Sequence, residues 1–160
     1  MARTNQRAIP IALIVIAALL LIARIASHFL KDEPKLEQST ATGVKWMSHD
    51  DGLATARATG KPILYDFTAE WCPPCHLLDE EVFRDAQFAA EINRRFVPVR
   101  VLDRQQEEGR NPPHVAALQQ QYRIDGFPTV IFASTDGIEL ARTVGFPGAD
   151  EFRRVMGSVR

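Results

Sequence analysis

Near the middle of this 160-residue chain stands the run Glu70-Trp71-Cys72-Pro73-Pro74-Cys75-His76, which contains its only two cysteines. Two thiols at this spacing can close a small disulfide ring. If a helix begins between them, the first thiol lies at the helix N-terminus, where unpaired backbone N–H groups and the macrodipole stabilise a thiolate. Pro74 fits this placement, because proline is tolerated in the first helical turn. The run therefore predicts that Cys72 attacks disulfides and that Cys75 resolves the mixed disulfide.

The segments on either side of the cysteines predict a strand before them and a helix after them. Residues 62–68 read Pro-Ile-Leu-Tyr-Asp-Phe-Thr, a mostly apolar run of the kind that forms a buried central strand. A helical pattern begins after the cysteines with Leu77, Leu78, Glu81 and Val82. A strand-to-helix junction is the context that a Cys-x-x-Cys redox motif requires.

Three other uses of the cysteine pair compete with redox chemistry. The first alternative is a pair of buried structural thiols, because cysteine is often a plain core residue. A zinc site needs two more ligands, which would have to come from the scattered histidines His28, His49, His76 and His114. The run from Cys72 to His76 also matches the attachment signature of c-type haem, although haem needs a mostly helical pocket and a strand precedes this motif. We expect neither a metal nor a cofactor.

Residues 44–160 resemble the thioredoxin family in two separate motifs. The run Tyr65-Asp66-Phe67-Thr68-Ala69-Glu70-Trp71-Cys72-Pro73-Pro74-Cys75 is similar to the active-site strand and turn of that family, and Gly126-Phe127-Pro128-Thr129 is similar to its cis-proline loop. The stretch from Cys75 to Val101 is closer to the membrane-tethered and periplasmic branch, which includes the C-terminal domain of the transmembrane thiol:disulfide interchange reductase. The resemblance implies an α/β, thioredoxin-like fold in which helices flank a central mixed β-sheet.

The resemblance also implies roles for residues outside the cysteine pair. Asp66, six positions before Cys72, would shuttle a proton to or from Cys75. Trp71 would frame the thiols. A cis peptide between Phe127 and Pro128 would lie opposite Cys72 and pair with an extended substrate segment. The expected catalytic residues are Cys72, Cys75 and Asp66, and the expected substrate-binding residues are Trp71, Phe127 and Pro128.

Two features depart from the family pattern. The residues between the cysteines are Pro73-Pro74 and not the Gly-Pro of cytosolic thioredoxins, so reduction, oxidation and isomerisation of disulfides all stay open. Thioredoxins place a lysine near the buried aspartate, whereas the nearest cation here, Arg100, lies one position out of phase. Because Asp66 lies mid-strand among apolar neighbours, we expect it to be a buried, unpaired carboxylate with a raised pKa.

The rest of the chain alternates between helical and strand patterns. The expected strands are residues 44–46, 63–68, 97–102, 129–133 and 138–144. The expected helices are residues 48–59, 74–82, 86–95, 114–122 and 149–159, with Gly60 ending the first and Asp85 capping the third. Residues 104–113 read as a polar loop. This order predicts one α/β domain over residues 44–160.

The first 30 residues predict a membrane anchor. Residues 8–23 carry no charge, and extending the span to Leu30 gives 23 residues, or about 34 Å of helix, with Arg24 inside it. A cleaved signal peptide is the alternative, but Arg24 then lies at an unfavourable position before the cleavage site. Either segment exports the domain. Residues 31–43 are polar and predict a linker.

The charge balance argues against nucleic-acid binding. Residues 31–160 carry 16 basic and 20 acidic side chains, and the sequence contains no basic stripe.

Together these observations predict a membrane-anchored thiol–disulfide oxidoreductase, held by residues 8–30, with its domain on the exported, periplasmic side. Its substrates would be protein thiols and disulfides, and a redox partner protein would recycle the Cys72–Cys75 pair. A soluble periplasmic protein, released by signal cleavage, is the alternative location. The alternative function is a non-catalytic module that binds or assembles cysteine-containing or haem proteins through the same groove.

Overall fold

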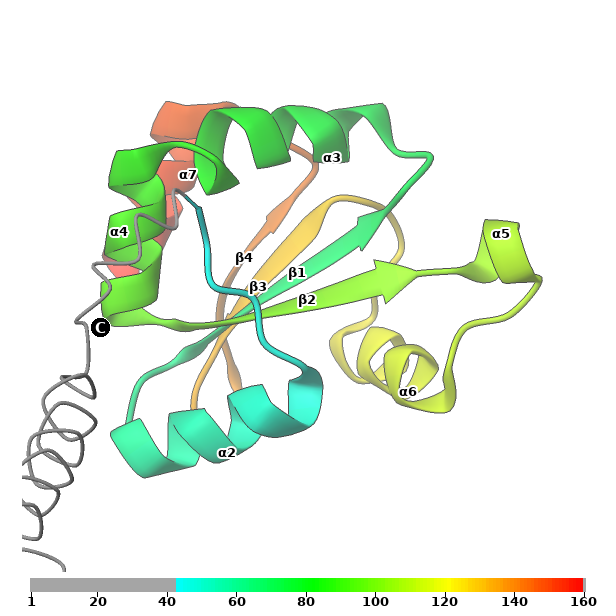
Figure 1. The fold of residues 1–160 in the computed structure, drawn as a ribbon, viewed down its shortest axis with the longest axis horizontal. Helices are drawn as coiled ribbons and strands as arrows, with labels where there is room; N and C mark the ends of the chain where they lie inside the picture. Colours follow the sequence, from blue (N-terminus) through cyan, green and yellow to red (C-terminus); the bar gives the residue numbers. More distant parts are fainter. Residues whose placement is uncertain (1–42, 160) are drawn as a thin grey trace, which may run out of the picture. The chain divides into compact units, whose positions relative to one another are not determined.

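A four-stranded β-sheet forms the centre of residues 43–159, the part of the chain that the computed structural model describes (Figure 1). The strands lie in the order β2-β1-β3-β4. The central strand β1 (Ile63–Ala69) runs parallel to β2 (Val97–Asp103) and antiparallel to β3 (Thr129–Ala133). The edge strand β4 (Glu139–Val144) pairs antiparallel with β3. The mixed central sheet that the sequence predicts is therefore confirmed.

Strand β1 is buried along almost its whole length, because helices cover both faces of the sheet. Successive side chains of a strand point to opposite faces. Tyr65 and Phe67 accordingly join one hydrophobic cluster, and Leu64 joins the other. Asp66 shares the alternation of Leu64, so its carboxylate projects from the second face of the sheet.

The first face of the sheet is covered by α2 (His49–Thr59) and α6 (Pro113–Tyr122), which lie below the sheet in Figure 1. Their buried side chains pack against alternate residues of β1, β2 and β3. The cluster includes Ala56, Val115, Leu118 and Tyr122 from the helices and Tyr65, Phe67, Val99 and Ile131 from the strands.

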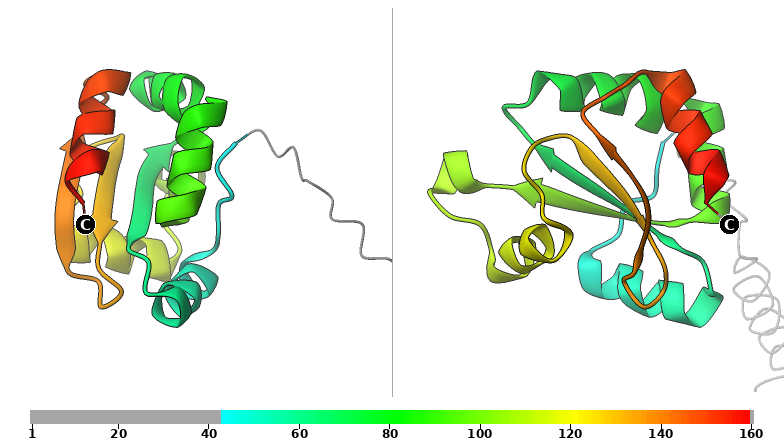
Figure 2. Two further views of the ribbon diagram at one scale, coloured as in Figure 1. Left: turned by 90° about the vertical axis from the view of Figure 1, so that its left-hand side faces the viewer. Right: turned by 180° about the vertical axis from the view of Figure 1, so that it is seen from behind.

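The second face is covered by the helical segment that follows the cysteines and by the C-terminal helix. In sequence order these elements are α3 (Pro73–Leu78), the π-helical turn η1 (Asp79–Phe83), α4 (Ala86–Arg95) and α7 (Ala149–Ser158). The right-hand view of Figure 2 shows them on the opposite side of the sheet from α2 and α6. Their core side chains include Leu78, Val82, Phe88, Ile92, Phe152 and Met156.

The helix ends follow the signals in the sequence. The Ser48 hydroxyl accepts a hydrogen bond from the Asp51 N–H at the start of α2, and Gly60 ends that helix in the left-handed conformation with φ of 71°. The Asp85 carboxylate accepts bonds from two N–H groups in the first turn of α4. These caps satisfy backbone groups that the helices leave unpaired. The predicted end of α2 at Gly60 and the predicted start of α4 at Asp85 are therefore confirmed.

Residues 44–46 do not form the strand that we expected. Met47 alone makes an isolated bridge to Val99, and its N–H donates to the Pro98 carbonyl at 2.9 Å. The N–H groups of Val44 and Lys45 bond instead to the Phe83 carbonyl and to the Asn93 side chain. The segment therefore crosses the edge of the second helical layer and does not extend the sheet.

Other elements also differ from the sequence-based expectation, several of them by one residue at an end. The polar loop after β2 contains a short helix, α5 (Gln105–Glu108). The active-site helix begins at Pro73, one residue earlier than expected, and widens into the π-helical turn η1 after Leu78. In that turn the Arg84 N–H donates to the Asp79 carbonyl, five residues back.

The predicted anchor over residues 1–30 and the linker up to residue 42 lie outside the described residues. Within residues 43–159, none of the helices has the length and apolar character needed to cross a bilayer.

Candidate active site

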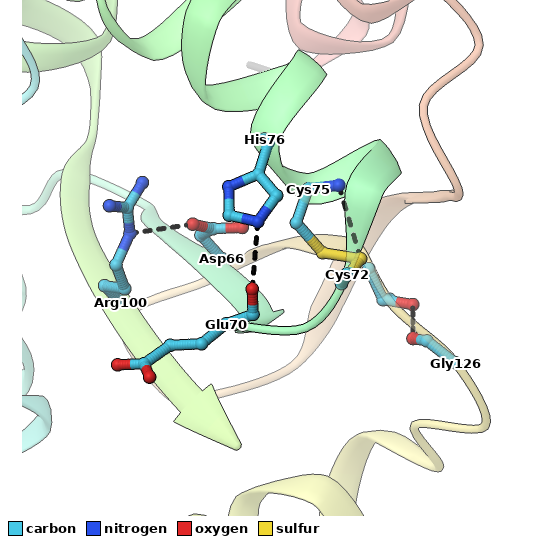
Figure 3. Close-up of a disulfide and its surroundings, with 8 residues drawn as sticks. Asp66, Glu70, Cys72, Cys75, His76, Arg100 and Gly126 are labelled. Atoms are coloured by element: carbon cyan, nitrogen blue, oxygen red, sulfur yellow. Dashed lines mark hydrogen bonds and ion pairs between the residues drawn. A yellow bond between two sulfur atoms is a disulfide. The ribbon is translucent and has the colours of Figure 1, made fainter. Parts of the chain in front are cut away.

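The cysteine pair lies at the junction between β1 and α3 and forms a disulfide (Figure 3). Cys72 is the N-cap residue of α3, and the Cys75 N–H donates to its sulfur at 3.3 Å. Pro73 and Pro74 occupy the first turn, where backbone N–H groups have no partner within the helix, so the N–H that proline lacks is not needed. The cysteines are therefore linked to each other, which excludes the free structural thiols considered above.

One side of the disulfide is covered by two aromatic residues. Trp71 precedes Cys72 and keeps 46% of its surface exposed. Its ring meets the Phe127 ring edge to face, with 6.0 Å between the centroids. Phe127 also packs against the buried cluster that contains both cysteines. The exposed Trp71 and the half-buried Phe127 thus form an aromatic border beside Cys72.

The loop before β3 brings Pro128 to the same side. The Phe127–Pro128 peptide is cis, as the sequence motif predicts. The Thr129 hydroxyl donates to the Gly126 carbonyl at 2.8 Å, and the Pro128 carbonyl accepts from the Gly145 N–H at 2.8 Å. These bonds tie the loop to β3 and to the end of β4.

A cavity of about 300 Å³ opens beside this aromatic border. Trp71, Phe127 and Ile124 supply its apolar wall, and the polar wall comes from α5 and α6 through Gln105, Gln106 and Gln119. The carboxylates of Asp103 and Asp125 also line it, so the cavity combines apolar surface with amide and acidic groups beside Trp71.

The other side of the disulfide contains an ion pair between a buried carboxylate and a partly exposed arginine. Asp66 is 2% exposed, and its Oδ2 accepts from Arg100 Nε at 2.9 Å. The parallel register pairs Asp66 directly with Arg100, and both side chains project from the second face of the sheet. The expectation of an unpaired Asp66 and an out-of-phase Arg100 is therefore wrong, because comparison with the lysine of thioredoxins does not fix the register between β1 and β2.

Burial nevertheless raises the pKa of Asp66 from its ordinary value of 3.8 to about 6, while Arg100 opposes the shift. Removal from water disfavours the charged carboxylate more strongly than one ion pair favours it. Asp66 Oδ1 has no hydrogen-bond partner among residues 43–159. The raised pKa that the sequence predicts is confirmed, and one oxygen is left able to take a proton.

Asp79 and Trp46 complete this side of the site, and sequence reasoning missed both. Asp79 Oδ1 accepts from Arg100 Nη2 at 2.7 Å, so Arg100 bridges two carboxylates. The Trp46 ring lies against the Arg100 guanidinium, with 4.2 Å from Cζ to the centroid. The position of Asp79, four residues after Cys75 and hence one helical turn away, is a signal that could have found it.

A second cavity, of about 240 Å³, leads to Cys75 from this side. Asp79, Arg100 and His76 line it together with Glu70. The His76 ring is exposed and its Nε2 lies 2.9 Å from the Glu70 carbonyl oxygen, which holds it beside the first turn of α3 (Figure 3). Water in this cavity can reach Cys75 without crossing the aromatic border.

In the described part of the chain, no three His, Cys, Asp or Glu side chains are grouped so that they could hold a metal ion.

Comparison with known proteins gives a consistent result. A family model described as a thioredoxin-like domain matches residues 49–160. The thiol:disulfide interchange protein DsbD of Yersinia enterocolitica is 30% identical over 146 residues, which cover 88% of this chain and 24% of that protein. The disulfide bond reductase DsbH of Chlamydia pneumoniae is 26% identical over 111 residues, covering 68% of this chain and 67% of that protein.

Among solved structures, a DsbH oxidoreductase superposes with a TM-score of 0.64 at 21% identity and covers 99% of this chain and 94% of its own. At that identity the likeness shows the shared fold. The chain spans only about a quarter of the length of the DsbD relative.

Proposed function

The chain belongs to the thioredoxin-like domain family, and we propose that it is a thiol–disulfide oxidoreductase that exchanges disulfides with exported proteins. The observation that carries this proposal is the Cys72–Cys75 disulfide at the N-terminus of α3, with the buried carboxylate of Asp66 on the adjoining strand. The names of its relatives, an interchange protein and a disulfide bond reductase, favour the reductive direction.

In that direction the reaction begins with the dithiol form. The Cys72 thiolate attacks one sulfur of a substrate disulfide, the substrate S–S bond breaks, and the other substrate sulfur leaves as a thiolate that takes a proton from water. The product is a mixed disulfide between Cys72 and the substrate. The N-terminal position of Cys72 on α3 favours the thiolate that this step needs.

Cys75 completes the exchange. Its thiol gives a proton to the Asp66 carboxylate, and the resulting thiolate attacks the Cys72 sulfur. The mixed disulfide breaks, and the second substrate sulfur leaves and is protonated. The substrate has then gained two electrons, and the Cys72–Cys75 pair has lost them. A pKa near 6 suits Asp66 for this exchange, because the group can both accept and release a proton near neutral pH.

Substrate would bind on the aromatic side of the disulfide. Trp71 and Phe127 provide apolar contact, and the backbone around Pro128 provides hydrogen-bonding groups for an extended segment. A redox partner protein would reduce the disulfide again through the same face, since Cys72 must be reached in both directions.

The membrane location is part of the proposal. Residues 8–30 would anchor the domain, with residues 31–43 as a tether on the exported side. The native protein should then stay in the membrane fraction through high-salt and carbonate washes, and it should keep its full length. Recovery of a soluble form that begins near His28 would instead establish a cleaved signal peptide.

The test of the activity is reduction of insulin by dithiothreitol, with and without the protein. We expect catalysis by the wild type and none above background by Cys72→Ser. A wild type that binds exported proteins but does not accelerate insulin reduction would favour the non-catalytic binding module.

A further inference from the structure

We propose that Trp46 is a positioning residue of the redox site, whose indole ring holds the Arg100 guanidinium in the orientation that pairs with Asp66. The inference rests on the proposed function, because it concerns the residue that we propose as the proton relay of Cys75. Trp46 touches neither cysteine, and it would act only through Arg100.

The Arg100 guanidinium lies between aromatic rings and carboxylates. Its Cζ is 4.2 Å from the centroid of the Trp46 ring and 5.6 Å from that of Phe83. Trp46 and Phe83 meet edge to face at 4.8 Å, so the two rings form one corner. A guanidinium is planar, and stacking on an indole restricts rotation of that plane.

With its plane restricted, Arg100 directs two different N–H groups at two carboxylates. Nε donates to Asp66 and Nη2 donates to Asp79, at 2.9 and 2.7 Å. The Arg100 side chain is still 32% exposed, so without the ring it could swing toward water. Trp46 thus adds a contact to the guanidinium besides the two carboxylates.

Trp46 is itself fixed by the backbone on either side of it. We call residues 43–47 the strap. The Val44 N–H donates to the Phe83 carbonyl at 3.2 Å, and the Met47 N–H donates to the Pro98 carbonyl at 2.9 Å. Asn93 holds the strap at two points, since its Oδ1 accepts from the Lys45 N–H and its Nδ2 donates to the Gly43 carbonyl.

The charged groups around Asp66 determine the direction of the effect. Arg100 on β2 stabilises the carboxylate, and Asp79 on η1 opposes it. The other groups nearby, Glu70, Cys75 and His76, line the cavity beside Arg100 and Asp79, and Arg84 pairs with the outer oxygen of Asp79. If Arg100 leaves Asp66, burial and Asp79 act on the carboxylate unopposed, and Asp66 keeps its proton to a higher pH.

The experiment is a pH titration of Asp66 in the full-length chain with the disulfide closed. The ¹³C chemical shift of its carboxyl carbon is the readout. We compare wild type with Trp46→Leu, which keeps an apolar side chain but removes the aromatic face. The midpoint should rise by about 1 unit, because the contribution of a neighbouring opposite charge is partly lost. Trp46→Phe keeps an aromatic face, and its midpoint should stay near that of wild type.

A matched control uses a cation–π contact far from the disulfide. Arg153 Cζ lies 3.9 Å from the centroid of Phe88 on α4. Phe88→Leu should lower the unfolding temperature, as Trp46→Leu should, and leave the Asp66 midpoint unchanged. In an Arg100→Met background, Trp46→Leu should produce no further shift, because its route of action is gone.

Two results would overturn the inference: an unchanged or lowered midpoint in Trp46→Leu, or the same rise in the Arg100→Met background as in wild type. If Trp46→Leu does not fold, Asn93→Ala replaces it, because that variant releases the strap without touching Trp46, and it should raise the midpoint by a smaller amount. The titration needs no turnover, so absence of insulin reduction by the wild type would refute the proposed function alone.

Discussion

The two sides of the Cys72–Cys75 disulfide are built from different kinds of residue. On the Cys72 side, the exposed Trp71 and the half-buried Phe127 form an aromatic border beside a cavity with amide and acidic groups. On the Cys75 side, the buried Asp66 pairs with the partly exposed Arg100. The first side has the surface to bind an extended protein segment, and the second has the groups to move a proton. The two thiols are only three residues apart, yet one lies beside aromatic side chains and the other beside charged ones. In the proposed mechanism, each environment suits a different step.

This comparison predicts that changes on the two sides should affect different kinetic quantities. Changes on the Cys72 side should alter attack and substrate affinity. Changes on the Cys75 side should alter resolution and its dependence on pH.

The largest expected effect is that of Cys72→Ser. The nucleophile is lost, so insulin reduction should fall by at least about 10³-fold. The rate of precipitation of insulin in the presence of dithiothreitol gives the measurement, with wild type as the reference. Activity of Cys72→Ser within tenfold of wild type would assign the attack to Cys75, and the steps that we assign to the two sides would be exchanged.

Asp66→Asn should have the next largest effect, and only on the Cys75 side. Without a base beside Cys75, resolution of a preformed mixed disulfide should slow by about 10²-fold or more. Stopped-flow mixing separates this step from attack by Cys72, which should stay within a few-fold of wild type. Equal slowing of both steps would mean that Asp66 is an ordinary structural residue.

The same variant should change how stability depends on pH. The pKa of Asp66 is raised on folding, so the folded state binds more protons than the unfolded state between 3.8 and about 6. Wild type therefore loses stability as pH rises through this window, and Asp66→Asn lacks this loss. The free energy of unfolding of the variant, relative to wild type, should improve by about 2–3 kcal/mol between pH 4 and pH 7.

Urea denaturation at the two pH values checks this prediction. A difference between variant and wild type that stays constant with pH would show that Asp66 titrates normally. Burial of Asp66 is what makes the outcome depend on pH, because it raises the pKa of the carboxyl group while Arg100 opposes the shift.

The smallest expected effect is that of Trp71→Ala, on the Cys72 side. Removing half of the aromatic border should weaken substrate binding by about 1–2 kcal/mol, or roughly 5–30-fold in KM. Trp71→Phe should restore most of the affinity, because it keeps the edge-to-face contact with Phe127. The pH dependence of resolution should match wild type in both variants. A shifted profile would show that the Cys72 side also influences resolution, and that the two sides do not act separately.

The sequence predicted the Cys72 side well because that side is made of contiguous motifs. The strand, the two cysteines and their prolines follow one another along the chain, and Phe127-Pro128 stands in a short motif of its own. The helix boundaries at Ser48, Gly60 and Asp85 were equally predictable, since each capping residue acts on N–H or C=O groups within a few positions.

The Cys75 side was predictable only in part, because it is made by pairing between distant segments. Burial of Asp66 follows from its apolar neighbours. Its contact with Arg100 depends on the register of β2 against β1, which no local motif specifies. Trp46 reaches Arg100 because the strap follows the second helical layer. There the Asn93 side chain bonds to the backbone of residues 43 and 45, where we expected a strand over residues 44–46.

The central claim is that Cys72 attacks and Cys75 resolves. The most direct test is to express Cys72→Ser and Cys75→Ser, capture disulfide-linked substrates, and identify the bonded cysteine by mass spectrometry under non-reducing conditions. The account predicts that Cys75→Ser accumulates mixed disulfides, all through Cys72, because the resolving thiol is absent. Cys72→Ser should trap almost nothing. Abundant adducts through Cys75 in Cys72→Ser, with few in Cys75→Ser, would contradict it.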